Sequence, residues 1–158
     1  MRRASVLLSA AGVAFGLLLF RVLAEILPPH PAAIGFGAAC LLPAAAVLAA
    51  MTLLQIATRF ATGAFDPTLG RDGRLLVVNQ RAITNTVEQL ACFAPSLLAL
   101  SAAAASPPLL ALGLTFATAR LAFWVGYLIA PILRAPGMAA TGAVNLATFA
   151  WAAWAWLG

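Results

Sequence analysis

Five long apolar segments, separated by short breaks, are the feature that most constrains the fold of this chain. They cover residues 4–27, 33–57, 82–105, 108–133 and 137–157. Each is close to the ~20 residues that an α-helix needs to cross about 30 Å of hydrocarbon. Only 8% of the residues are charged, whereas soluble domains carry roughly 25%. We therefore predict an all-α integral membrane helical bundle whose outer surface contacts the lipid bilayer.

The breaks between the segments contain residues that interrupt helices. Proline, which both starts and ends helices, occurs in all four breaks. The breaks are Pro28-Pro29-His30-Pro31, the polar stretch 59–80, Ser106-Pro107-Pro108 and Ala135-Pro136-Gly137. Pro43 and Pro131 lie inside apolar segments, where we expect them to kink the helices.

The positions of the arginines predict how the chain is oriented in the membrane. If successive segments alternate in direction, one side of the membrane receives Arg2, Arg3, Arg59, Arg71, Arg74, Arg81 and Arg134. The connections on the other side, residues 28–32 and 106–108, contain no Lys or Arg. The positive-inside rule then places the N-terminus and the loop of residues 58–81 in the cytoplasm. The predicted location is the inner (cytoplasmic) membrane.

Several classes of protein are disfavoured by the charged residues and the cysteines. The net charge is +5, but the arginines flank apolar segments instead of clustering on one polar face, so no nucleic-acid partner is expected. Cys40 and Cys92 lie inside apolar segments, which favours free thiols over a disulfide framework. His30 is the only histidine, so no metal site is expected.

The first segment has two interpretations. Two arginines precede an apolar core of residues 4–20, as they do in a secretory signal peptide. That core is longer than the roughly 7–15 residues of a signal h-region, and no small-x-small cleavage site follows it. A retained membrane helix is the favoured interpretation. Arg21 and Glu25 are four residues apart and are expected to form an ion pair on one helical face.

A polar stripe opens the third apolar segment. Arg81, Asn85 and Glu88 follow the spacing i, i+4 and i+7, which places them on one helical face. Ionised groups are costly inside a membrane unless they are paired or hydrated, so such a stripe indicates a functional site. The alternative is a polar seam that joins neighbouring helices.

The fourth segment carries a second polar set. Arg120 lies within the apolar run, and Tyr127 and Arg134 follow at intervals of seven residues. The short break at 106–108 makes the third and fourth segments antiparallel neighbours, so Arg81 and Arg134 are expected at the same membrane face. We predict that Arg120 pairs with Glu88, which would neutralise both charges. Tyr127 either lines a pocket or packs in the core.

Together these residues resemble a family signature. The run Arg81-x-x-x-Asn85-x-x-Glu88, followed by Pro95, Arg120-x-x-Phe123-x-x-x-Tyr127 and Arg134, is similar to the paired motifs of the MAPEG family, the membrane-associated proteins in eicosanoid and glutathione metabolism. The resemblance covers about residues 33–157. Family members are four-helix membrane proteins that form homotrimers and bind glutathione between subunits near the cytoplasmic face.

The resemblance implies a division of the chain and a set of site residues. Residues 1–31 would form an extra N-terminal transmembrane helix and a short outer loop, and residues 32–158 a four-helix MAPEG-like domain of a bacterial-type member. The cofactor would be glutathione, with Arg134 as the catalytic residue that stabilises its thiolate, because a nearby guanidinium favours the anion of a thiol. The residues expected to bind glutathione are Arg59, Arg81, Asn85, Glu88, Arg120 and Tyr127.

The resemblance also implies a function. The leading hypothesis is a membrane-bound glutathione-dependent transferase or peroxidase acting on lipophilic electrophiles. Phe123 stands where several enzymatic members of the family carry a tyrosine or histidine, and Gln89 stands where some carry a tyrosine. A non-catalytic lipid-binding or scaffold protein of the same fold is therefore an alternative. A small transporter subunit using Arg120 and Glu88 is a second alternative, although the spans carry few other polar residues to line a path.

Overall fold

The computed structural model describes residues 2–30, 33–103 and 107–158, and within these ranges the chain is helical. Its five longest helices correspond to the five apolar segments, which confirms the predicted all-α bundle. The α-helices are α1 (Arg2–Ile26), α2 (Ile34–Ala39), α3 (Leu42–Thr62), α4 (Arg74–Ser101), α5 (Leu109–Ile129) and α6 (Ala135–Leu157). Two short 3-10 helices, η1 (Pro67–Leu69) and η2 (Pro131–Arg134), lie in connections.

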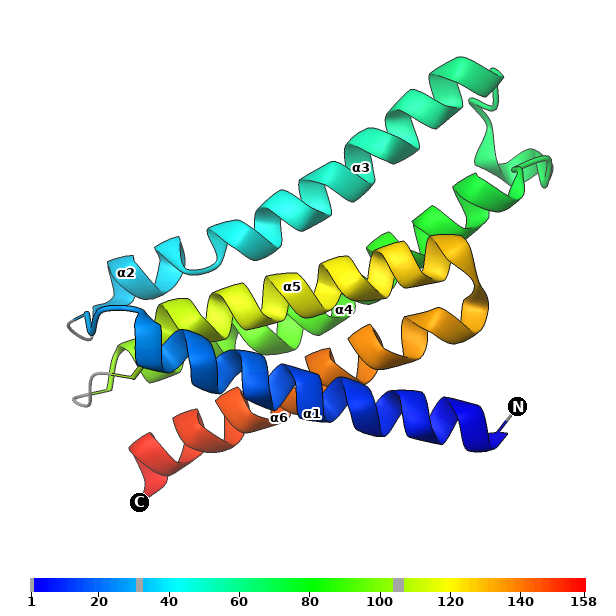
Figure 1. The fold of residues 1–158 in the computed structure, drawn as a ribbon. Helices are drawn as coiled ribbons and strands as arrows, with labels where there is room; N and C mark the ends of the chain where they lie inside the picture. The colour runs from blue at the N-terminus through cyan, green and yellow to red at the C-terminus, as the bar shows by residue number, and fades with distance from the viewer. Residues whose placement is uncertain (1, 31–32, 104–106) are drawn as a thin grey trace.

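The long helices run up and down along one direction, as the alternating segments predicted (Figure 1). One end of the bundle gathers the N-terminus, the α3–α4 connection and the α5–α6 connection. The opposite end gathers the last turns of α1 and α4, the first turns of α2 and α5, and the C-terminus. The arginine-rich connections therefore lie together at one end.

Three stretches of the described residues are long and apolar enough to cross a membrane. They are Arg3–Ile26, Ile34–Thr62, which joins α2 and α3, and Leu109–Ile129. Helices α4 and α6 fall short of this apolar character. Their polar side chains include Asn79, Thr86 and Thr141, which are completely buried inside the bundle, whereas Gln80, Arg81 and Glu88 on α4 are exposed.

The expected break over residues 59–80 is shorter than predicted. Helix α3 continues to Thr62 and ends where Gly63 adopts the left-handed conformation, with φ 67°. Helix α4 already begins at Arg74, because its first turns bury Leu76 and Asn79 against neighbouring helices. The true connection, residues 63–73, contains η1, where the Asp66 carboxylate accepts hydrogen bonds from Thr68 that hold its pKa below the ordinary value.

The two internal prolines act differently from one another. Pro43 stands in the first turn of α3, directly after the break that separates α3 from α2, so the predicted interruption is confirmed. Pro131 does not kink a continuous helix, because α5 ends at Ile129 and Pro131 opens η2. Ala135-Pro136-Gly137, expected as a break, is instead the first turn of α6, where proline fits without losing a helical hydrogen bond.

Helix α1 packs along α6 more extensively than any other two described elements pack on each other. Small residues allow this approach. A Cβ atom on Gly12 would overlap the carbonyl oxygen of Pro136, and one on Gly16 would lie 3.2 Å from the Cβ of Ala140. Close backbone approach through small residues is the usual way in which membrane helices associate.

Candidate functional site

A cavity of about 490 Å³ lies between α1, α4, α5, η2 and α6, at the end of the bundle where the arginines gather. Its polar lining comes from four segments far apart in the sequence. The polar residues are Ser5, Ser9, Arg81, Asn85, Tyr127 and Arg134. The rest of the lining is apolar and includes Phe123 and Met138. Among the residues that the structure describes, the lining of the cavity therefore includes two arginines and no acidic residue.

The side chains of Arg134 and Tyr127 contact each other in this cavity. The guanidinium carbon of Arg134 lies 4.8 Å from the centre of the Tyr127 ring, within the range of a cation–π contact. Gly126 makes this arrangement possible, because a Cβ atom there would overlap the carbonyl oxygen of Leu133. The chain can thus turn back tightly through η2. Tyr127 is buried and Arg134 is exposed, so the arginine covers the ring from the solvent side.

Two of the three residues in the stripe on α4 line the cavity. Arg81 and Asn85 do so, and they are one helical turn apart. Glu88, a further turn along α4, is exposed and is not part of the lining. Its Oε2 atom lies 3.4 Å from Nδ2 of Asn85, a long hydrogen bond. Glu88 therefore touches the cavity wall only through Asn85.

Arg120 is fully buried behind the cavity wall. Its Nη1 donates to Oδ1 of Asn85 at 3.1 Å, and its guanidinium carbon lies 3.9 Å from the centre of the Phe123 ring. Its Nε and Nη2 atoms have no partner among the described residues. The predicted pair of Arg120 with Glu88 is wrong. Asn85 stands between them and bonds to both, because Glu88 points to the exposed side of α4.

Arg59 lies outside the cavity in this chain. It donates to both carboxylate oxygens of Asp72, at 3.0 and 3.4 Å, and to the carbonyl oxygen of Ala64 at 2.6 Å. The Arg59 and Asp72 side chains are 19% and 15% exposed, so the pair is well shielded. Arg59 thus closes the connection between α3 and α4.

At the opposite end, Arg21 and Glu25 form the expected ion pair on α1, with N and O 3.2 Å apart.

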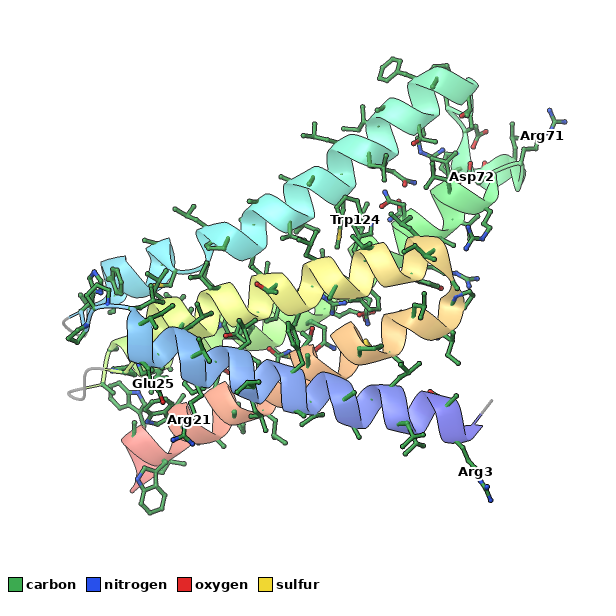
Figure 2. All side chains as sticks on the ribbon, in the orientation of Figure 1. Arg3, Arg21, Glu25, Arg71, Asp72 and Trp124 are labelled. Atoms are coloured by element: carbon green, nitrogen blue, oxygen red, sulfur yellow. The ribbon has the colours of Figure 1, made fainter. Side chains whose placement is uncertain are left out.

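A buried polar network links α3, α4 and α5, and sequence analysis missed it. The Nδ2 of Asn79 donates to the carbonyl oxygen of Met51 and to Oε1 of Gln55, both at 2.8 Å. The Trp124 indole, which points into the space between these helices (Figure 2), donates to Oδ1 of Asn79 at 2.7 Å. The sequence predicts that Asn79 lies in a loop, so its burial is a departure from that prediction.

A second, apolar groove of about 820 Å³ runs along α4 and α6 toward the C-terminal end. Gln89 and Asn145 stand at its start, and Nδ2 of Asn145 donates to Oε1 of Gln89 at 2.8 Å. Gln89 therefore joins the two helices.

Both cysteines are free thiols, as predicted. Cys92 lies on this groove and Cys40 lies in the core.

Apolar helices and a cavity lined by two arginines at one end of the bundle together describe an integral membrane protein of the helical-bundle class. A family model for the MAPEG family matches residues 36–154, from α2 to within α6. The chain belongs to the MAPEG family, whose members are mostly glutathione-dependent enzymes. No curated protein and no solved structure matches the chain. Helix α1 precedes the matched residues.

Proposed function

We propose that this protein is a membrane-bound glutathione-dependent transferase or peroxidase that acts on lipophilic electrophiles. The observation that carries the proposal is the cavity in which Arg81 and Arg134 face the same space with no acidic residue in the lining. Glutathione is a tripeptide with two carboxylates and a thiol, and it is anionic at neutral pH. Two guanidinium groups, an amide and a phenol match that set of groups.

Each residue has a distinct role in this proposal. Arg81 binds a carboxylate through paired N–H donors, the geometry for which guanidinium groups are suited. Asn85 lines the cavity, where Arg120 holds its Oδ1 and its Nδ2 makes only a 3.4 Å hydrogen bond to Glu88. Tyr127 donates a hydrogen bond from its phenol O–H group to the ligand. Arg120 acts indirectly, because it is buried behind Asn85 and keeps that side chain in place.

Arg134 is the proposed catalytic residue. A thiol has a pKa of about 8.5, so most of it is protonated at neutral pH. A guanidinium beside the sulfur favours the thiolate and lowers that pKa. Bound glutathione supplies the nucleophilic thiolate. The Tyr127 ring under Arg134 restricts where the guanidinium can lie and so helps to aim it.

The lipophilic partner of the reaction is suggested by the apolar groove along α4 and α6. Gln89, at its start, lies one helical turn from Asn85 in the cationic cavity. A substrate with a long apolar part could occupy the groove while its reactive carbon or oxygen approaches the cavity. We further propose a homotrimer in the inner membrane, with the cationic cavity, the N-terminus and the 63–73 connection on the cytoplasmic side.

The test uses the full chain purified in detergent. Calorimetry should show glutathione binding, and an assay with a lipophilic electrophile should show its conjugation or reduction. Arg134→Ala should lower turnover at least about tenfold, the usual effect of losing a group that acts on the reacting atoms. Arg71→Ala is the matched control, because Arg71 is exposed in the 63–73 connection and points away from the bundle (Figure 2).

A lipid-binding protein without catalysis is the second candidate. The size and apolar lining of the groove along α4 and α6 favour it. If the purified chain retains lipids but calorimetry detects no glutathione binding, this candidate replaces the enzyme. If glutathione binds but Arg134→Ala retains full turnover, the role of Arg134 is wrong while the site stands.

A further inference from the structure

Helix α1, which precedes the family match, contributes two hydroxyl groups to the cationic cavity. Ser5 and Ser9 are the only polar residues between Ala4 and Phe20. They are four residues apart and therefore lie on one face of the helix. Both line the cavity that contains Arg81 and Arg134. The polar side chains within this apolar stretch are thus directed at the site and not at the lipid.

The position of these serines is set by the packing of α1 on α6. Gly12 and Gly16 continue the same helical face and contact Pro136 and Ala140 at close range. A one-residue rotation or slip of α1 would bring a larger side chain against the α6 backbone. Helix α6 starts immediately after Arg134, so the contact that holds α1 also fixes Ser9 relative to the segment that carries the arginine.

The Ser9 hydroxyl differs in its bonding from most buried hydroxyls of the described helices, although the buried Thr86 hydroxyl also has no partner there. Hydroxyls inside the helices typically donate to the carbonyl four residues earlier, as Thr115 does to Ala111 and Thr141 to Gly137, both at 2.7 Å. Ser9 is half-buried and makes no such bond within the described ranges. A polar group at membrane depth without an intrahelical partner is favourably placed to bond a ligand.

We infer that α1 is part of the ligand site and that the Ser9 hydroxyl donates a hydrogen bond to an anionic oxygen of the bound tripeptide thiol. This inference rests on the proposed function. Ser5, nearer the N-terminus and exposed, lies at the mouth of the cavity. The ligand is held between the hydroxyls of α1 on one side and the guanidinium groups of α4 and η2 on the other. Residues outside the matched family region therefore help to determine the affinity of the protein for this ligand.

Glutathione affinity of the full chain in detergent, measured by calorimetry, tests the inference. Ser9→Ala should weaken binding about 2- to 10-fold, the loss that corresponds to one hydrogen bond. Ser9→Leu should weaken it by more than about tenfold, because the larger side chain fills the cavity as well. Ser9→Thr keeps the hydroxyl and should retain affinity within about twofold. Ala10→Leu, at the exposed neighbouring position, is the matched control and should bind as the unaltered chain does.

A second measurement covers the case in which Ser9→Leu disturbs packing. Ser9→Cys should react with a charged thiol-modifying reagent, and S-methylglutathione, which has no free thiol, should slow that reaction severalfold. The Ala10→Cys variant should show no such protection. If the unaltered chain binds glutathione but Ser9→Ala binds equally well and Ser9→Cys is not protected, α1 is not part of the site. If the unaltered chain does not bind glutathione, the proposed function and this inference both fail.

Discussion

Oδ1 of Asn85 lies 3.1 Å from Nη1 of Arg120, and this single hydrogen bond connects the cavity wall to the most deeply buried charge of the bundle. The remaining charge of Arg120 is partly compensated by the face of Phe123. Asn85 thus lines the cavity and also satisfies a guanidinium that no carboxylate reaches within the described residues.

Loss of the Asn85 side chain should destabilise the whole bundle. Asn85→Leu leaves Arg120 without its acceptor, and a buried charged group that loses its hydrogen-bond partner costs about 3 kcal/mol. Thermal unfolding in detergent should show a clear drop in the unfolding temperature. The double variant Asn85→Leu/Arg120→Leu should recover part of the loss, because the unpaired charge is gone. Thr84→Val, at an exposed neighbour, should have little effect, and an equal loss in that control would contradict the assignment.

The Asn79 network should be similarly sensitive. Asn79→Leu removes three hydrogen bonds and leaves the Trp124 indole N–H and the Oε1 atom of Gln55 without their partner. An unsatisfied buried polar group costs about 1–3 kcal/mol, so we expect a loss of at least about 2 kcal/mol in stability. The measurement is thermal or denaturant unfolding in micelles. The matched control is Gln80→Leu at the exposed next position, and the network would be unimportant if both variants unfolded alike.

The close contact between α1 and α6 should not tolerate a larger side chain. Gly12→Ala places a Cβ atom on the carbonyl oxygen of Pro136, and backbone cannot rotate away as a side chain can. Overpacking of this kind costs about 1–3 kcal/mol, which outweighs the gain in helix propensity of alanine over glycine. We expect lower thermal stability together with weaker glutathione binding. Gly142→Ala, where no atom lies within 4 Å of the added Cβ, is the control and should be at least as stable as the unaltered chain.

The Arg59–Asp72 pair should control how easily the α3–α4 connection opens. Asp72→Asn removes the charge that Arg59 contacts at 3.0 Å in a shielded position. Trypsin should then cleave after Arg71 and Arg74 severalfold faster, because local opening exposes this connection. Glu25→Gln alters the exposed pair on α1, which contributes little, and should leave the cleavage rate unchanged. A rate in Asp72→Asn equal to that of the unaltered chain would show that another contact closes the connection.

Much of the architecture could be predicted from the sequence because it depends on local properties. Apolar segment length predicted the five long helices, and helical spacing predicted that Arg81 and Asn85 share a face. The short break at 106–108 predicted that α4 and α5 are antiparallel neighbours, and this brought Arg81 and Arg134 to the same end. The motif residues led to the family that the comparison confirmed. These inferences need only periodicity, hydrophobicity and chain connectivity.

The tertiary structure decided which polar groups meet. Arg120 bonds to Asn85 and not to Glu88, Arg59 pairs with Asp72, and Asn79 joins three helices from a stretch that had been assigned to a loop. The approach of Ser5 and Ser9 to the cationic cavity likewise depends on how α1 lies on α6. The physical reason is that a polar contact between helices depends on their relative rotation and axial register. Side-chain packing over the whole bundle sets the rotation and the register. The periodicity of a single segment does not predict either of them.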